Sequence, residues 1–192
     1  MFRTASAGVS RAARRVITRA RSSRFARAQD GVAAVEFGLI AAPFLALLFA
    51  IIETAFVFFA GQALEAAVAN AGRLVMTGQA FNKGYTKATF KKDAVCPQMV
   101  KMFNCMDKLF ISVENYTKFS DAGTTPPYDS KGQLDTSDSK MPYHPGEPGE
   151  VIVVSFYYQW PIFVPQISSL ANQNGSSRLL VATSVFRNEP YK

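Results

Sequence analysis

The chain has few of the residues that build metal and catalytic sites. Its 192 residues include one His and two Cys, too few for a zinc site with several protein ligands. The sequence contains no glycine-rich phosphate loop, no nucleophile motif and no His pair, and the lone His144 lies in a stretch rich in Pro and Gly. We therefore expect no metal, no cofactor and no enzymatic activity.

Acidic residues are absent from the first 29 positions, which carry eight Arg. The whole chain has 21 Lys and Arg against 14 Asp and Glu, and its net charge of +7 would ordinarily suggest a nucleic-acid partner. The excess lies entirely in residues 1–30, because the 13 basic and 13 acidic side chains beyond them cancel. The charge belongs to an N-terminal leader that precedes an apolar run, so we expect no nucleic acid as a partner.

A long uncharged run follows the leader. Between Glu36 and Glu53 lie 16 residues without charge, and the apolar character continues to residue 60. A bilayer core of roughly 30 Å needs about 20 apolar helical residues, so residues 32–60 are predicted to form a transmembrane helix. Eight Arg precede this helix and only Arg73 follows it closely, which predicts a cytoplasmic N-terminus and a C-terminal portion across the membrane.

Three other interpretations of this segment stay open from the residues alone. A buried core helix is one, although the run is hydrophobic on every side. A cleaved secretory signal is another, but it needs a shorter apolar region of about 7–15 residues that ends at a small-residue site. A leader rich in Arg and Ser is also typical of a mitochondrial transit peptide, which would make this a single-pass mitochondrial inner-membrane protein.

After residue 60 the apolar run becomes amphipathic. Apolar side chains recur at helical spacing, at Leu64, Val68, Ala71 and Val75. Residues 77–78, Thr-Gly, are a plausible helix end. We therefore expect one long helix over about residues 33–76, with its first half in lipid and an amphipathic extension at residues 61–78 that supports a soluble domain.

Three stretches of the remaining domain, residues 79–192, carry β-strand patterns. The strongest places apolar and aromatic side chains on one face of residues 151–160, and the others cover residues 109–116 and 179–186. Residues 120–150, rich in Gly, Pro, Asp and Ser, are predicted to form a long surface loop. A small sheet needs a cover, which the amphipathic helix can supply. The expected fold is α+β, a long N-terminal helix packed on a small antiparallel sheet in a pilin-like arrangement.

The two cysteines, Cys96 and Cys105, have eight residues between them. They lie in the portion that the charge distribution places outside the cytoplasm, where disulfides form and persist. A disulfide is therefore expected, and two free buried thiols are the alternative.

The junction between leader and apolar run has the features of a processing site. Gly31 ends the leader, residues 1–31, and Glu36, followed by Phe37, is the fifth residue counted from Val32. This junction resembles the prepilin-peptidase site of type IV pilins and pseudopilins, and its Glu-Phe pair is similar to the variant of tight-adherence (Tad, or Flp) pilus systems. The resemblance implies cleavage after Gly31, where glycine offers an extended backbone to a membrane protease.

Other segments resemble the TadE-like proteins of Tad pilus systems. They are residues 71–79, the two cysteines, residues 158–161 and the closing residues 182–191. The resemblance implies a minor pseudopilin, anchored in the bacterial inner membrane with a periplasmic domain, that supports assembly of a surface pilus used in adhesion. It also implies as partners a prepilin peptidase, other pilins and pseudopilins, Tad secretion components and the lipid bilayer.

Glu36 gains an expected role in assembly from this resemblance, and Glu53 is a second candidate because it is the next acid along the apolar run. Glu36 would pair with the freed N-terminal amine of a neighbouring subunit, because an unpaired carboxylate near the apolar core costs a few kcal/mol. For Glu53, a specific pairing between helices and a position near the far headgroups are equally open. An unprocessed single-pass envelope protein that presents a periplasmic binding domain remains the alternative function.

Overall fold

The computed structural model describes residues 30–101, 103–165, 170–173 and 176–190. The chain divides into two compact units, Met1–Leu48 and Phe49–Lys192. Helix α2 (Asp30–Met76) provides the described part of the first unit and begins the second. Nearly all of the predicted leader, residues 1–31, lies outside the described residues.

Asp30 of helix α2 is the first described residue of the chain, and the helix ends where the sequence predicts. Its end is set by Gly78, whose φ of 74° lies in the left-handed region that favours glycine. The Phe49–Lys192 unit then continues through short helices and three strands, which are α3 (Gln79–Asn82), α4 (Lys87–Thr89), η1 (Phe90–Val95), η2 (Cys96–Gln98), α5 (Cys105–Lys108), β1 (Leu109–Tyr116), η3 (Phe119–Asp121), β2 (Val151–Pro161) and β3 (Ser177–Arg187).

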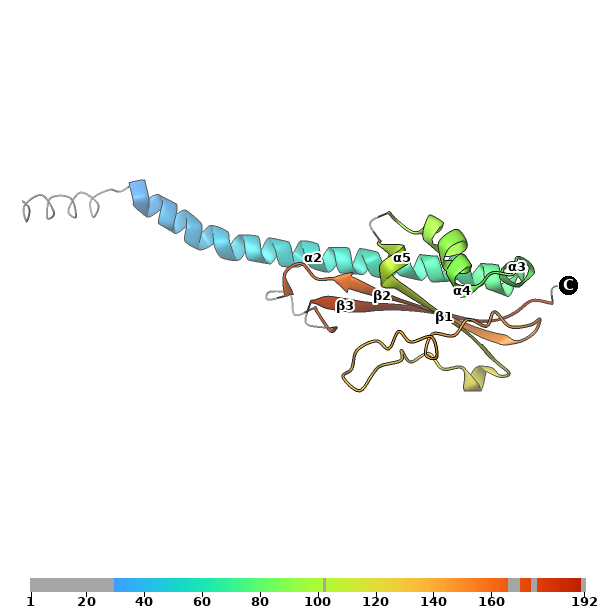
Figure 1. Ribbon diagram of the computed structural model, residues 1–192. Helices are drawn as coiled ribbons and strands as arrows, with labels where there is room; N and C mark the ends of the chain where they lie inside the picture. Colours follow the sequence, from blue (N-terminus) through green and yellow to red (C-terminus); the bar gives the residue numbers. More distant parts are fainter. Residues whose placement is uncertain (1–29, 102, 166–169, 174–175, 191–192) are drawn as a thin grey trace, which may run out of the picture. The chain divides into compact units, whose positions relative to one another are not determined.

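The three strands form one antiparallel sheet in the order β1-β2-β3, with β2 in the middle (Figure 1). In this register Phe156 of β2 lies beside Ile111 of β1 and Ala182 of β3. All three predicted strands are present within two residues of their predicted ends. The predicted α+β fold, a long N-terminal helix packed with a small antiparallel sheet, is confirmed.

The amphipathic part of α2 packs on one face of this sheet. The four apolar residues expected on its inner face are all buried, and they share one core with the inward side chains of the strands, among them Ile111, Val113, Ile152, Val154 and Phe156. Helix and strand approach closely at Gly72, where an added Cβ would lie 3.0 Å from a ring carbon of Phe186. A glycine at this point therefore lets α2 lie against β3.

The opposite face of the sheet is also covered, which the sequence pattern does not predict. Every residue of β2 from Val151 to Tyr158 is buried. Part of the cover comes from the predicted surface loop, whose Leu134 and Met141 pack in a second apolar cluster with Tyr157 and Leu179. Figure 1 shows this yellow-to-orange segment on the side of the sheet away from α2. The loop thus forms a third layer of the domain.

Tyr143 has a pKa far from that of a free tyrosine, and this shift yields a first prediction. Burial, with a smaller contribution from Tyr85, raises the pKa of Tyr143 to about 12. Its hydroxyl is buried without a hydrogen-bond partner among the described residues. The folded state therefore holds this proton more tightly than the unfolded state, whose tyrosine pKa is about 10, and stability should fall as pH rises from about 10 to 12.

We expect Tyr143→Phe to stabilise the protein by about 1 kcal/mol near neutral pH, because it removes an unsatisfied buried hydroxyl. The variant should also lose less stability than the wild type in alkaline solution. Urea unfolding in detergent, followed by circular dichroism at several pH values, measures both effects. Tyr128→Phe, at an exposed tyrosine, is the matched control, and equal alkaline losses in the wild type and Tyr143→Phe would contradict this account.

Candidate functional site

The residues of the expected processing site lie together at the start of α2. The side chains of Val32, Glu36 and Phe37 are exposed, and beyond its chain neighbours and the helix backbone no described heavy atom lies within 4 Å of the position that a Cβ on Gly31 would take. Gly31 is helical in this structure, and the extended backbone that it would offer to a protease stays a prediction.

The apolar side chains that follow are exposed on all sides. Residues 31–52 contain no buried residue, and their large apolar side chains include Phe37, Leu39 and Phe44. Helix Gly31–Met76 is long and apolar enough to cross a membrane, and none of its most apolar window is buried within the structure. Such an exposed surface, far larger than the apolar patches of ordinary soluble proteins, indicates contact with lipid or with other apolar helices.

Burial along α2 begins at Glu53. This residue is only 5% exposed, and Val57 and Ala60 are also buried on the same face of the helix. The helix therefore packs on its own domain from Glu53 onward, inside the stretch predicted as transmembrane, residues 32–60. Packing begins well before the predicted amphipathic extension at residue 61.

Glu53 is held by the chain segment that leaves β2. Its carboxylate oxygen Oε1 accepts hydrogen bonds from the backbone N–H groups of Phe163, at 2.5 Å, and Val164, at 3.0 Å. Hydrogen bonds to an ionised acceptor are stronger than neutral ones, and they supply part of the solvation that a buried carboxylate loses. The contacts of Glu53 that we describe lie within one chain, and its expected pairing between helices stays a prediction.

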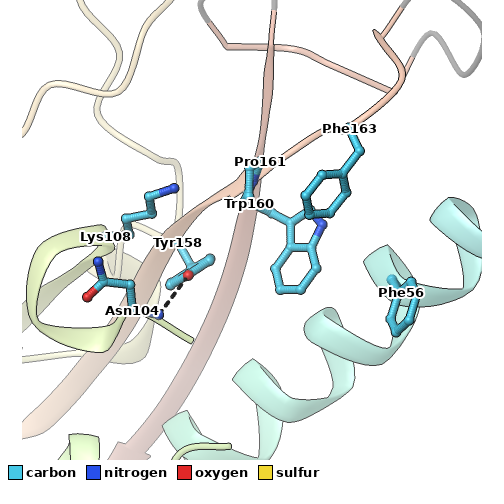
Figure 2. Close-up of a pocket in the computed structure, with 7 residues that line it drawn as sticks. All are labelled: Phe56, Asn104, Lys108, Tyr158, Trp160, Pro161 and Phe163. Carbon is cyan, nitrogen blue, oxygen red and sulfur yellow. Dashed lines mark hydrogen bonds between the residues drawn. The ribbon is translucent and has the colours of Figure 1, made fainter. Parts of the chain in front are cut away.

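The expected disulfide is present between Cys96 and Cys105, whose Cα atoms are 5.7 Å apart. The closed loop carries Phe103, which is buried with its ring centroid 4.8 Å from that of Tyr158 and 5.7 Å from that of Trp160. The next residue, Asn104, donates its backbone N–H to the Tyr158 hydroxyl at 3.2 Å (Figure 2). The disulfide thus lies beside an aromatic cluster at the end of β2.

Removal of this cross-link gives a second prediction. A chain with Cys96→Ser and Cys105→Ser should lose about 2–3 kcal/mol of unfolding free energy, because the loop is no longer closed in the unfolded state. Urea unfolding with and without reductant measures the change. Reductant should lower the unfolding midpoint of the wild type and leave that of the double variant unchanged. An unchanged midpoint for the double variant would show that the aromatic packing holds this loop without the cross-link.

The lone histidine lies elsewhere, at the start of the segment that leads into β2. The backbone N–H of His144 donates to Val113 O at 2.8 Å, and its side chain borders an open hollow of about 300 Å³ together with Glu147 and Glu150. Within the described residues, no group of three His, Cys, Asp or Glu side chains is placed to hold a metal ion.

The described structure thus defines a protein with one helix able to cross a membrane, whose second half is built into an α+β domain. The family model of the TadE-like protein matches residues 31–73, and the resemblance to the TadE-like family is confirmed over this segment. The match relates the chain to Tad pilus systems, whose TadE-like members are pilus components. No curated protein and no solved structure matches the chain.

The backbone groups that hold Glu53 are the functional residues that the sequence does not reveal. Phe163 and Val164 act through their N–H groups, which carry no side-chain signal, and they lie more than a hundred residues from their partner. The only available sign was the acid itself, because a carboxylate after 16 uncharged residues needs a compensating partner.

Proposed function

We propose that the protein is a minor pseudopilin of a Tad or Flp pilus system that supports pilus assembly and, through the pilus, surface adhesion. The observation that carries the proposal is where the TadE-like match begins. It starts at Gly31, the residue after which cleavage is expected, and continues along α2 to residue 73. The match therefore covers the N-terminal helical part of the chain that would remain after processing, and it leaves out residues 1–30 of the basic leader.

The proposed anchor is the exposed part of α2. Residues 31–52, at about 1.5 Å per helical residue, reach about 33 Å, which suits a hydrocarbon core of roughly 30 Å. Glu53 would then lie at the far boundary of the membrane, where its own domain begins to cover the helix. The Arg-rich leader keeps the N-terminus cytoplasmic in this proposal, and residues 79–192 form the periplasmic domain.

Assembly would proceed by lateral packing of these exposed helices. In the membrane the helix surface exchanges lipid contacts for contacts with other pilins and pseudopilins, and Glu36 sets the register by pairing with a neighbouring N-terminal amine. The amine exists only after a prepilin peptidase has cut between Gly31 and Val32. Processing and assembly are therefore coupled in the proposal, and the domain is left free to contact Tad secretion components.

Cleavage is tested by a third prediction. Gly31→Leu should abolish maturation, because a branched side chain at this position restricts the backbone and hinders its entry to the protease. N-terminal sequencing of protein purified from membranes should find Val32 first in the wild type and Met1 in the variant. Gly38→Leu is the matched control, because Gly38 lies in the same helix with equally open surroundings.

The same measurement separates the three interpretations of the N-terminus. A wild-type chain that begins at Met1 would support an unprocessed envelope anchor, and cleavage inside the Arg-rich leader would support a mitochondrial presequence. The pilus role has its own test, because deletion of the gene should remove pili from the cell surface. Normal piliation in the deletion strain would refute the assembly role even if cleavage occurs after Gly31.

A further inference from the structure

An apolar pocket of about 360 Å³ opens beside the end of β2 in the Phe49–Lys192 unit. Aromatic side chains from three places in the sequence form most of its wall, namely Phe56 of α2, Tyr158 and Trp160 of β2, and Phe163. Figure 2 shows Asn104 and Lys108 on the other side of the pocket from Trp160, Phe163 and Phe56. Its volume falls in the range of about 300–1,000 Å³ that is usual for small-molecule sites.

The pocket wall includes a buried hydrogen-bond donor for which the described part of the chain supplies no acceptor. Trp160 is 4% exposed, and its indole Nε1 has no hydrogen-bond partner among the described residues. A buried N–H without an acceptor costs about 1–3 kcal/mol, so most such groups are paired. Among the described residues the indole therefore remains available to an acceptor that enters the pocket.

The pocket also offers one positive charge. Lys108 lines it with a partly buried side chain, and no ion pair of its ammonium is found within the described part of the chain. The opposite wall presents large exposed apolar groups, since Phe163 is 75% and Phe56 is 47% exposed. A ligand that fits has an anionic group, hydrogen-bond acceptors and an apolar portion.

Position along α2 decides which ligand meets these requirements. Phe56 lies one turn beyond Ile52, the last residue of the exposed apolar segment, a rise of about 6 Å. The hydrocarbon core is roughly 30 Å thick and the bilayer about 40–45 Å with its headgroups, so this turn falls in the headgroup layer on the far side. Phe58 and Phe59, which follow Phe56 along α2, are also exposed aromatic side chains, and such side chains suit that interface.

We propose that this pocket binds one anionic glycerophospholipid of the membrane in which α2 is anchored. The aromatic wall receives the start of an acyl chain, the Trp160 indole donates to an ester oxygen, and Lys108 neutralises the phosphate. The lipid fixes the height of the domain against the bilayer. The inference rests on the membrane anchoring in the proposed function and is independent of the pilus role.

The chain supplies its own probe, because Trp160 is its only tryptophan. Full-length protein is reconstituted into phosphatidylcholine vesicles that contain equal fractions of either brominated phosphatidylglycerol or brominated phosphatidylcholine, since bromine quenches indole fluorescence on contact. We expect the anionic lipid to quench at about fivefold lower fraction than the zwitterionic one, the preference that one Lys near a membrane surface provides. Excess soluble glycerol phosphate should not relieve the quenching, because it lacks the apolar portion.

Variants make the test specific to the pocket. Lys108→Gln should make the two lipids quench at nearly equal fractions. Lys118→Gln, at an exposed lysine beyond the other end of β1, should leave the preference for the anionic lipid unchanged. Phe163→Ala should weaken quenching at least threefold, and its exposed position spares the fold. Equal quenching by both lipids, or a preference that survives Lys108→Gln, would overturn the proposal. Either result would show only that Trp160 lies near the membrane.

Two further outcomes would also overturn it. Relief of quenching by glycerol phosphate would make the pocket a site for soluble phosphates. Self-association that Phe163→Ala abolishes, without any lipid preference, would make the occupant a second copy of this chain. Protease protection of the reconstituted protein reports insertion of α2 separately, so a failure of the anchoring is distinguished from a failure of the lipid site.

Discussion

Replacement of Glu53 by alanine is expected to destabilise the domain by about 2–3 kcal/mol. The change leaves the N–H groups of Phe163 and Val164 without the charged acceptor that now holds them, at a position that is 5% exposed. It also releases the segment after β2 from α2. Urea unfolding in detergent, followed by the fluorescence of Trp160 two residues before that segment, measures the loss.

The helix offers a matched control in Glu65, an exposed residue three turns further on whose carboxylate accepts only from Gln62, at 3.3 Å, among the contacts described. Glu65→Ala should change stability by less than about 0.5 kcal/mol. The loss of unfolding free energy for Glu53→Gln should lie between the losses for Glu53→Ala and Glu65→Ala. The amide oxygen of Gln can still accept one hydrogen bond but carries no charge. If Glu53→Ala leaves stability unchanged but reduces pilus assembly, the acid acts between subunits instead.

The main elements of the fold are predictable because their signals are local and periodic. Leu64 and Val68 follow the helical period, and Ile152 and Val154 follow the two-residue period of a strand, so each pattern identifies one buried face. The helix end at Gly78 follows from local backbone preference. The short helices between residues 79 and 108 have at most six residues each, too few to display a period.

The third layer of the domain could not be predicted in the same way. Leu134 and Met141 are isolated apolar residues in a stretch rich in Gly, Asp and Ser, with no period that marks them as buried. Their partners, Tyr157 and Leu179, lie on the strand faces that alternation assigns to solvent. Burial of both faces of β2 depends on where a long loop returns, which is a property of tertiary packing.

The candidate site also has one part that local sequence signals predict and another that depends on tertiary packing. Gly31, Glu36 and Phe37 form a short motif that the sequence carries in full, and the TadE-like match begins at that motif. The role of Glu53 within its own domain depends on backbone groups that meet it only in the folded chain. Burial along α2 begins at Glu53, so the proposed membrane segment ends there, whereas the apolar pattern of the sequence extends to residue 60.

Glu36 carries the second large effect. In the proposed fibre its carboxylate is the one charged side chain of residues 32–52, and it pairs with the amine that cleavage creates on a neighbouring subunit. Glu36→Leu should leave the chain processed and membrane-bound but reduce its incorporation into pili at least tenfold. Removing one partner of a desolvated charge pair costs about 2–5 kcal/mol, because the amine stays buried without its counter-charge.

The expected loss is measured by immunoblotting sheared pili and membranes from cells that carry each variant. Val35→Leu, a change of similar size at an exposed neighbour, is the control that should assemble normally. Glu36→Gln should resemble Glu36→Leu if charge pairing drives assembly, and should resemble the wild type if a hydrogen bond suffices. Normal assembly of Glu36→Leu would remove Glu36 from the mechanism, and α2 would then assemble through apolar contacts alone.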